Sequence, residues 1–216
     1  MKLPESVQSV DKAIADRKTL KVMSEKQYPF ALAEEVVEAL LEAASWAPFH
    51  RPADKSHCDS DLCSKVPWRF YVLDRDNCRA LRQKLLDAGD KTKIPAMLLS
   101  ATNLIQATWL PNPKKAPSDQ LFDPSMENME HIAAASSAIQ NLLVAATARE
   151  IQTYWSSGGA LRKPETMKLL GIPEGEILLG SLFLYGPITK FSKTSPGKLR
   201  DQRGDLRSWS KWVELD

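Results

Sequence analysis

The sequence predicts a domain that mixes α-helices and β-strands, of class α/β or α+β. Segments with helical hydrophobic periodicity alternate along the chain with short runs of β-branched and aromatic residues, and no segment repeats another. The length of 216 residues fits one compact domain or one subunit of an intertwined oligomer. We therefore treat residues 1–216 as a single domain that carries an inserted loop at 51–66 and a basic C-terminal segment at 190–216.

The composition excludes several classes of protein. Hydrophobic residues make up 43% of the chain and charged residues 26%, which is ordinary for a soluble globular protein and excludes a disordered or low-complexity chain. The net charge of +2 is too small for a typical nucleic-acid-binding surface. No apolar run is long enough to span a bilayer, and the first residues lack the apolar core of a secretory signal. We therefore expect a cytoplasmic protein with neither a nucleic-acid partner nor a membrane partner.

The first quarter of the chain predicts two helices and a long loop. Apolar residues recur at helical spacing in Ser6–Asp16, which indicates an amphipathic helix. A continuous apolar stripe predicts a second helix over Ala33–Ala47, and Pro48 ends it. Residues 49–66 are polar and irregular, so we expect a loop that is long for a compact domain.

The next segments predict a strand, a helix and a buried apolar run. Trp68–Leu73 is aromatic and β-branched, which is typical of a strand. Asn77–Ala88 predicts a helix. We interpret Ala96–Leu104 as a buried strand, although its length also fits a helix. Several prolines in 111–124 predict a second long loop.

The longest helical pattern runs over Ser125–Glu150. Its centre is small and apolar on nearly every face. A helix that is apolar all round is buried on all sides. We therefore expect this helix to lie in the core or at a subunit interface.

The last predicted elements are two strands and a short helix. Ile151–Trp155 predicts a short strand that leads into a turn of serine and glycine. Pro164–Leu170 predicts a short helix with proline at its start and Gly171 at its end. Ile177–Tyr185 is apolar and predicts another strand.

The cysteines suggest neither a disulfide framework nor a metal site. The chain has three of them, with no C-x-x-C pair, and we expect no disulfide in a reducing compartment. Cys58 and Cys63 lie near His57 and downstream of His50, but a zinc site needs about four ligands at suitable spacing. We favour an exposed insertion and expect no bound metal.

The familiar catalytic motifs are missing from the sequence. It contains no glycine-rich dinucleotide fingerprint, P-loop, nucleophile elbow or H-E-x-x-H zinc motif, and only three histidines. An enzyme with this sequence would therefore take its chemistry from an organic cofactor.

Three segments suit a planar cofactor that carries a phosphate. Arg17–Thr19 offers two cations and a hydroxyl for a phosphate, although basic residues also commonly close a helix. Ala47–Arg51 is the second segment. The third, Tyr154–Gly159, has small residues that let backbone N–H groups approach a ligand, or it is an ordinary turn after a strand. The basic segment 190–216 either supplies a cation to the phosphate or is a solvated surface.

The order of these motifs along the chain is more specific than any one of them. After Arg17–Thr19 come LLEAASWAP, PWRFYVLD, QNLLVAATA, TYWSSGGAL, LGIPEGE and LLGSLFLYGP, and then Arg203. In this order, over roughly residues 10–210, the chain closely resembles the FMN-dependent nitroreductase family, in particular its small branch with a W-x-S-G-A-L turn.

The resemblance implies an α+β fold whose central, mostly antiparallel sheet is wrapped by helices. It also implies an intertwined homodimer with two FMN sites between the subunits. By motif, Arg17, Lys18 and Thr19 match the family triplet that holds the phosphate and ribityl oxygens of FMN. Arg203 matches a C-terminal arginine that grips the phosphate.

The flavin ring itself is assigned to two other segments by the same resemblance. Pro48, Phe49 and His50 match the stretch that covers the flavin from the other subunit, and Arg51 or Lys18 is the candidate cation near its N1–C2=O edge. The turn that passes the flavin edge near N5 is matched by Tyr154, Trp155, Ser156, Ser157 and Gly158.

The activity that the resemblance implies is an NADH- or NADPH-dependent oxidoreductase. It would reduce nitroaromatics, quinones or similar electron-poor small molecules by ping-pong hydride transfer through flavin N5, with no catalytic acid or base from the protein. Two alternatives remain open: another reductive reaction on the same scaffold, such as dehalogenation or flavin fragmentation, and a flavin- or ligand-binding protein without turnover.

The sequence departs from the family pattern between two prolines. Pro48 and Pro67 lie 19 positions apart, where the family usually keeps only a few residues. Val66 stands directly before Pro67, in place of the usual Asn and Gln. We expect the insertion 51–66 to be a mobile element that affects substrate specificity.

Overall fold

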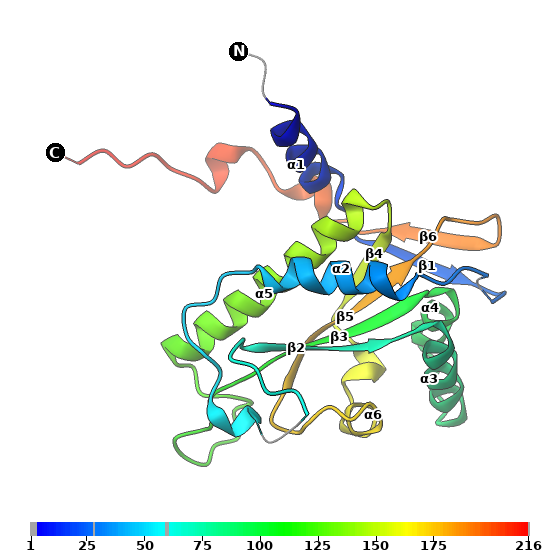
Figure 1. Cartoon of the computed structure of the whole chain (residues 1–216), viewed down its shortest axis with the longest axis horizontal. Helices are drawn as coiled ribbons and strands as arrows, with labels where there is room; N and C mark the ends of the chain where they lie inside the picture. The colour runs from blue at the N-terminus through cyan, green and yellow to red at the C-terminus, as the bar shows by residue number, and fades with distance from the viewer. Residues whose placement is uncertain (1–3, 28, 59–60, 216) are drawn as a thin grey trace.

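The computed structural model describes residues 4–27, 29–58 and 61–215 (Figure 1). A four-stranded antiparallel sheet forms its centre, with the strands in the order β2-β3-β5-β4. A separate two-stranded antiparallel sheet joins β1 and β6. The strands are β1 (Leu20–Ser24), β2 (Trp68–Leu73), β3 (Asn103–Trp109), β4 (Gln152–Ser156), β5 (Ile177–Tyr185) and β6 (Ser192–Pro196).

Helices pack on both faces of the central sheet, which confirms the α+β class and the antiparallel sheet that the resemblance implied (Figure 1). The α-helices are α1 (Glu5–Asp16), α2 (Glu34–Ser45), α3 (Arg75–Asp87), α4 (Ile94–Ser100), α5 (Met126–Ala148) and α6 (Pro164–Leu169). The 3₁₀ turns are η1 (Lys55–Cys58), η2 (Gly159–Arg162), η3 (Arg200–Gln202) and η4 (Leu206–Ser208).

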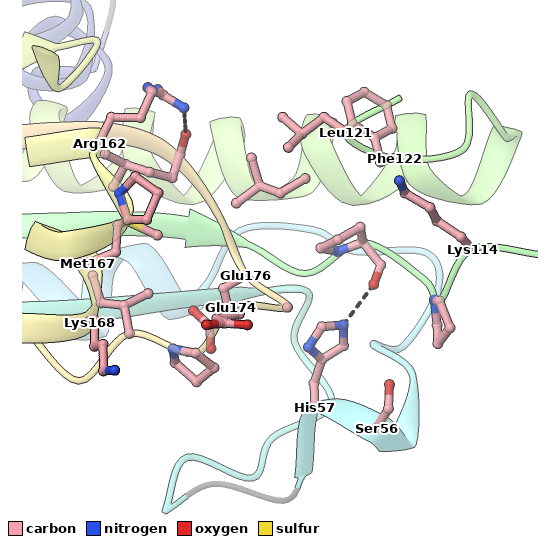
Figure 2. A pocket seen from close by; sticks show the side chains of 18 of the residues that line it. Ser56, His57, Lys114, Leu121, Phe122, Arg162, Met167, Lys168, Glu174 and Glu176 are labelled. Carbon is pink, nitrogen blue, oxygen red and sulfur yellow. Dashed lines mark hydrogen bonds between the residues drawn. The ribbon is translucent and has the colours of Figure 1, made fainter. Parts of the chain in front are cut away.

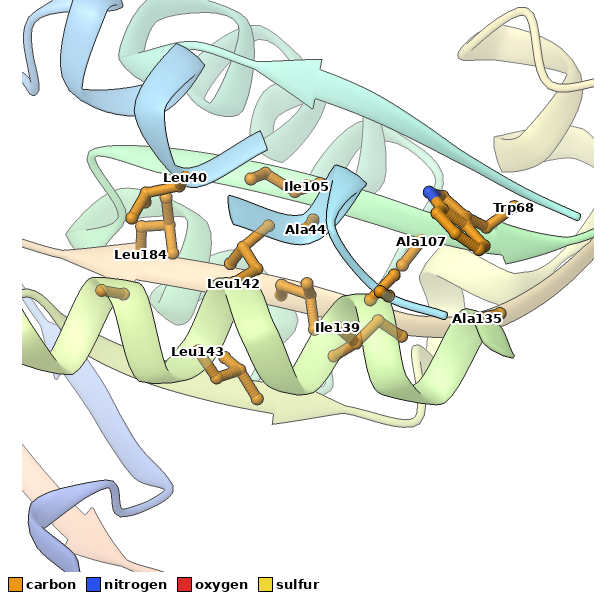
Figure 3. Packing of buried hydrophobic residues seen from close by; sticks show 14 of the residues in the cluster. Leu40, Ala44, Trp68, Ile105, Ala107, Ala135, Ile139, Leu142, Leu143 and Leu184 are labelled. Carbon is orange, nitrogen blue, oxygen red and sulfur yellow. The ribbon is translucent and has the colours of Figure 1, made fainter. Parts of the chain in front are cut away.

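The alternation of side chains along the strands divides the core into two clusters. On one face, Ile105 and Leu184 pack with Leu40 of α2 and Leu142 of α5 (Figure 3). On the opposite face, residues one position away along the same strands pack against α3 and α4. That second cluster includes Leu81, Leu98, Leu104, Phe183 and Tyr185.

Helix α5 is buried on the face that it turns toward the sheet. Ser125 is the N-cap of the helix, and its hydroxyl accepts a hydrogen bond from the Asn128 N–H at 3.2 Å. Ala138 and Leu142 are fully buried in the chain's own core, so this face confirms the expected core position. Ala133 and Gln140 on the other side are exposed, so within one chain the helix is not buried all round.

The strand predicted over Ala96–Leu104 is wrong. The chain instead forms α4, which ends at Ser100, and β3, which begins at Asn103. Pro95 sits in the first turn of α4, a position that proline favours. Because α4 is buried on nearly every face, its apolar pattern shows no helical period that would have distinguished it from a strand.

Strands β1 and β6 were not predicted from the sequence. Both are short, and β6 consists of polar, mostly exposed residues. Leu20 pairs with Pro196 and Ser24 pairs with Ser192, so the two strands come from opposite ends of the sequence. Such a pairing depends on the tertiary fold and leaves little local signal in the sequence.

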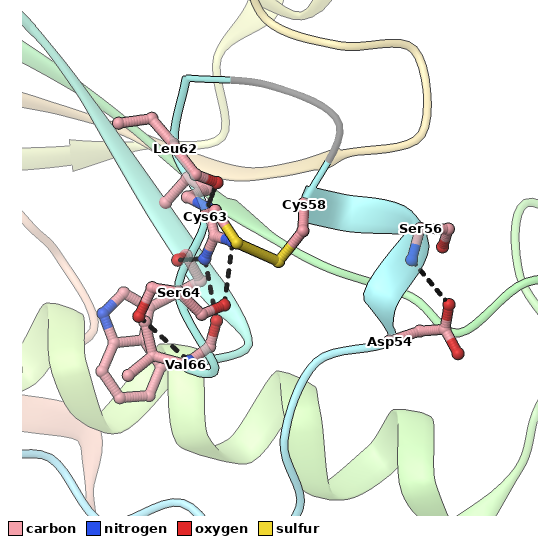
Figure 4. The surroundings of a disulfide bond; sticks show 9 residues. Asp54, Ser56, Cys58, Leu62, Cys63, Ser64 and Val66 are labelled. Carbon is pink, nitrogen blue, oxygen red and sulfur yellow. Dashed lines mark hydrogen bonds between the residues drawn. A yellow bond between two sulfur atoms is a disulfide. The ribbon is translucent and has the colours of Figure 1, made fainter.

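The predicted loop 49–66 is irregular except for η1, but the expectation of no disulfide is wrong. Cys58 and Cys63 form a disulfide, with their Cα atoms 4.3 Å apart where the loop folds back (Figure 4). The base of the loop is closed by a 2.8 Å hydrogen bond from the Ala53 N–H to the Lys65 carbonyl. Residues 59 and 60 of this predicted insertion lie outside the described residues.

Buried Arg69 of β2 holds the second half of the insertion. Its guanidinium donates hydrogen bonds to carbonyl oxygens of Leu62, Ser64 and Val66 at 3.2, 3.1 and 2.9 Å. These bonds therefore attach the second half of the insertion to the sheet, and the disulfide links that half to Cys58. No helix among the described residues is long and apolar enough to cross a membrane.

Candidate functional site

A pocket of about 760 Å³ lies where the end of α1, the end of β6 and strand β4 meet. We call it the arginine pocket. It brings together residues far apart in the sequence. Its lining consists of Arg17, Lys18, Thr19, Tyr154, Trp155, Pro196, Gly197, Lys198, Leu199, Arg200, Asp201 and Arg203.

Backbone contacts on both sides hold the first of these segments in place. Helix α1 ends at Asp16, and Thr19 then forms a parallel β-bridge with Thr153 of β4. On the other side, the Gly197 N–H donates to the Thr19 carbonyl at 2.8 Å. A Cβ at Gly197 would lie only 3.3 Å from the Thr19 Cβ, so glycine permits this close approach.

Three guanidinium groups give the pocket its charge. Burial, and then the positive charges of Arg203 and Arg200, lower the pKa of Arg17. Among the described residues, no carboxylate forms an ion pair with any of these three arginines. A cluster of like charges without a partner favours an anion, and guanidinium groups suit a phosphate in particular.

Two aromatic residues of β4 also line the pocket. Tyr154 and Trp155 are half-buried and point to opposite faces of the sheet, Tyr154 toward the core cluster at α3 and α4 and Trp155 toward the cluster at α2 and α5. The Lys21 ammonium lies 5.0 Å from the centre of the Tyr154 ring. The Trp155 indole crosses Gly180 of β5, where a Cβ would overlap the ring.

The turn after β4 continues from the same strand but does not line the arginine pocket. Ser156 is buried, and its hydroxyl accepts a hydrogen bond from the Gly158 N–H at 3.2 Å. Gly158 is also buried, with a φ of 106° that favours glycine. Ser157 between them is exposed.

The segment Pro48–Arg51 lies elsewhere in the chain. Phe49 packs edge-on against Trp68, with ring centres 5.9 Å apart. Arg51 Nε donates to Glu130 of α5 at 2.7 Å, and His50 Nδ1 lies 3.3 Å from the same carboxylate. The hydrogen bond from His50 and the charge of Arg51 lower the pKa of Glu130. Within one chain, these four residues do not join the arginine pocket.

Two cations of the arginine pocket were missed as site residues. Lys198 and Arg200 line it beside Arg203, and the Arg203 Nη1 donates to the Arg200 carbonyl at 2.7 Å. The sequence placed both within the basic segment 190–216. Nothing in their spacing indicated which of its cations would meet Arg17.

A larger cavity of about 1140 Å³ lies beside the first residues of β5 (Figure 2). Glu176, only 6% exposed, lines it and accepts hydrogen bonds from the Tyr71 and Thr108 hydroxyls at 2.8 and 2.5 Å. Burial and then this carboxylate raise the pKa of Tyr71. The insertion contributes Ser56 and His57, so within one chain it borders this larger cavity and not the arginine pocket.

No group of three or more potential metal ligands occurs among the described residues. Cys58 and Cys63, the candidate thiolate ligands, are joined in the disulfide. The lining of the larger cavity balances its cations Lys114, Arg162 and Lys168 with Glu165, Glu174 and Glu176, whereas among the described residues that line the arginine pocket the cations outnumber the single carboxylate, Asp201. We therefore regard the arginine pocket as the candidate functional site.

Comparisons with known proteins identify the family of the chain. The model of the Nitroreductase family matches residues 29–186. No curated protein matches the chain.

Solved structures share the fold at low sequence identity. A nitroreductase-like family protein from Bacillus cereus is 18% identical, with a TM-score of 0.66 and 100% of both chains covered. A protein from Desulfovibrio desulfuricans solved in complex with FMN is 19% identical, with a TM-score of 0.58 and 100% of both chains covered. A protein from Bacteroides thetaiotaomicron named NADH dehydrogenase/NAD(P)H nitroreductase is 19% identical, with a TM-score of 0.56 and coverage of 94% of this chain and 96% of the other.

The matched range, residues 29–186, includes all four strands of the central sheet. The architecture of that sheet and of its covering helices is shared with the solved structures. The chain belongs to the nitroreductase family.

Proposed function

We propose that the protein is an FMN-dependent oxidoreductase that uses NADH or NADPH to reduce nitroaromatics, quinones or similar electron-poor small molecules. The observation that carries the proposal is the cluster of Arg17, Arg200 and Arg203 in the arginine pocket, which forms no ion pair with a carboxylate of the described residues. FMN in the related Desulfovibrio desulfuricans structure and the name of the Bacteroides thetaiotaomicron protein support the choice of cofactor and donor.

The residues of the arginine pocket fit a terminal phosphate. A phosphate monoester carries up to two negative charges, which would offset much of the charge of the three guanidinium groups. Thr19 lines the same pocket, and its hydroxyl would meet the ribityl chain. FMN ends in such a phosphate, whereas in FAD the same position continues into an adenylyl group. We therefore favour FMN over FAD.

The ring of the cofactor would extend from the arginine pocket along β4. Tyr154 and Trp155 line the pocket, and the turn at 156–158 follows directly on the same strand. The chemistry that FMN supplies when bound is hydride transfer at N5 between a nicotinamide and an acceptor. The side chains named here bind and orient the cofactor, and we assign none of them the role of an acid or a base.

We also propose a homodimer with sites completed by both subunits. Apolar side chains are exposed on α1, where Val10 is 56% exposed, and on the C-terminal segment, where Trp212 is 95% exposed. The segment Pro48–Arg51 does not reach the arginine pocket of its own chain. In the proposed dimer it would cover the cofactor of the partner.

The test is the absorbance spectrum of the purified protein. We expect flavin bands that are bleached by NADH or NADPH without oxygen and that return when a quinone or nitroaromatic is added. Flavin bands that neither donor bleaches would indicate a binding protein without turnover. Protein that takes up no FMN would contradict the whole proposal.

A further inference from the structure

Arg162, the last residue of η2, joins two segments of the chain with its guanidinium. Its Nε donates to the Ser157 carbonyl at 2.9 Å. Its Nη1 donates to the Leu178 carbonyl at 2.5 Å (Figure 2). Ser157 belongs to the turn after β4, and Leu178 belongs to β5. One side chain therefore bridges the turn and the neighbouring strand.

This bridge begins where the backbone pairing of the two strands stops. The ladder between β4 and β5 runs from Gln152 opposite Tyr185 to Ser156 opposite Ser181. Ser157 comes one residue later, so it has no partner in that ladder. The Arg162 guanidinium supplies a donor to its carbonyl in place of a backbone N–H.

The turn is also packed tightly against the same arginine. A Cβ at Gly158 would lie 2.9 Å from Leu178 Cδ2 and 3.4 Å from Arg162 Cβ. The Gly158 N–H is held by the Ser156 hydroxyl. Residues 156–158 are therefore fixed by the ladder, by a serine hydroxyl and by the arginine.

We propose that Arg162 is a positioning residue that fixes the turn at 156–158 before the cofactor binds. The inference rests on the proposed function, in which the ring of FMN lies along this turn. A turn that is already ordered loses little conformational freedom when it meets its ligand, so the affinity is higher than for a mobile turn. The positive charge beside the turn would also favour the negatively charged reduced form of a nearby flavin.

Two variants separate the bridge from the charge. Arg162→Met removes both, and Arg162→Lys keeps the charge but cannot donate to both carbonyls in the same fork geometry. For Arg162→Met we expect the Kd for FMN to rise about tenfold, roughly the effect of losing one net hydrogen bond. We also expect a more negative reduction potential of the bound flavin. In Arg162→Lys the potential should return toward that of the wild type while the Kd stays raised.

Arg149→Met is the matched control. Arg149 is exposed and donates to a backbone carbonyl, that of Ala145 at 3.1 Å, but this bond lies within the end of α5. The control should bind FMN with the wild-type Kd and potential. Circular dichroism and the melting temperature of each protein report folding separately from cofactor binding.

The outcomes distinguish this inference from the proposed function. If the wild type binds FMN and Arg162→Met has an unchanged Kd, spectrum and potential, Arg162 has at most a structural role and the inference is wrong. If the wild type itself binds no FMN, the proposed function fails and this inference fails with it. If Arg162→Met does not fold, the decision rests on Arg162→Lys, whose wild-type Kd would overturn the inference.

Discussion

Arg203 lies beside Arg17 in the arginine pocket, where burial first and then the positive charge of Arg203 lower the pKa of the Arg17 guanidinium. The two residues are separated by almost the whole chain, yet both line the arginine pocket. The described residues give neither arginine an ion pair with a carboxylate. Like charges placed together repel each other, and a bound dianion would relieve this repulsion. The predictions on cofactor binding follow from this pair.

Arg17→Ala should weaken FMN binding by about 1.5–3 kcal/mol, because it removes a charge-assisted hydrogen bond to the phosphate. Titration of the apoprotein with FMN, followed by quenching of flavin fluorescence, measures the change. Arg149→Ala is the control, since it removes an exposed arginine outside the pocket. If Arg17→Ala binds FMN with the affinity of the wild type, Arg17 does not contribute to FMN binding.

Gly180→Ala should destabilise the protein by about 1–3 kcal/mol, the usual effect of overpacking a buried position. The new Cβ would overlap the Trp155 indole and displace it from the wall of the arginine pocket. Urea unfolding followed by tryptophan fluorescence measures the free energy of unfolding. Gly175→Ala is the control, because a Cβ there meets only His57 Cε1 at 3.8 Å. Equal stability of the two variants would contradict the packing described for Trp155.

The thiols should react in a fixed order. Burial raises the pKa of Cys78 to about 12, so in the native protein near neutral pH this thiol stays protonated and unreactive. Denatured but unreduced protein should be alkylated at Cys78 alone, and reduced protein at Cys58 and Cys63 as well. Mass spectrometry of the alkylated peptides identifies the sites. Alkylation of Cys58 before reduction would show that the disulfide is absent.

Cleavage of the disulfide should lower the free energy of unfolding by about 2 kcal/mol or less, because the loop that it closes is short. The comparison is between the oxidised protein and the double variant Cys58→Ser, Cys63→Ser, both unfolded in urea. Cys78→Ser would be a poor control, since that thiol is fully buried in the second core cluster.

Deletion of Asp54–Ser64 should leave the Kd for FMN unchanged but alter the relative kcat/KM values for different acceptors. The insertion does not line the arginine pocket, whereas it forms one wall of the larger cavity through Ser56 and His57. Acceptor profiles of the deletion variant and of the double serine variant, which keeps the loop, provide the comparison. Identical profiles for the deletion variant and the wild type would show that the loop is inert.

Ala133→Arg should yield a monomer that binds FMN poorly. Ala133 is exposed on the side of α5 away from the core, so the chain can fold with an arginine there, while the proposed dimer cannot bury it. Ala138 is not a usable probe, because it is fully buried in the chain's own core. Ala80→Arg, at an exposed position of α3, is the control. Light scattering measures the mass, and a monomeric wild type would refute the dimer.

Local patterns in the sequence were sufficient for much of the fold. Trp68–Leu73 and Ile177–Tyr185 form strands with the predicted bounds, since β-branched and aromatic content marks them. Ala96–Leu104 was wrong because a fully buried helix and a fully buried strand are both apolar throughout. The pairing of β1 with β6 depends on contacts between the two ends of the chain, and neither strand carries a strong signal of its own.

The candidate site was predictable only in part, because it too depends on contacts between distant parts of the chain. Arg17, Thr19, Tyr154 and Trp155 do meet in one pocket, in agreement with the motifs that named them. Arg200 was indistinguishable in sequence from other cations of the basic segment. The contact of the insertion with the larger cavity could not be predicted from the sequence either. It depends on the conformation that the Arg69 hydrogen bonds and the disulfide give to the loop.

The arginine pocket is built from the residue after α1 and from residues beyond β6, joined by the hydrogen bond between Gly197 and Thr19. During protein synthesis the ribosome must therefore pass Arg203 before the proposed phosphate site can form, even though the whole central sheet is already made. A nascent chain that stops early, or a product clipped near Gly197, would keep much of its core and yet hold no cofactor. Cofactor retention would then act as a check that the polypeptide is whole near its carboxyl end.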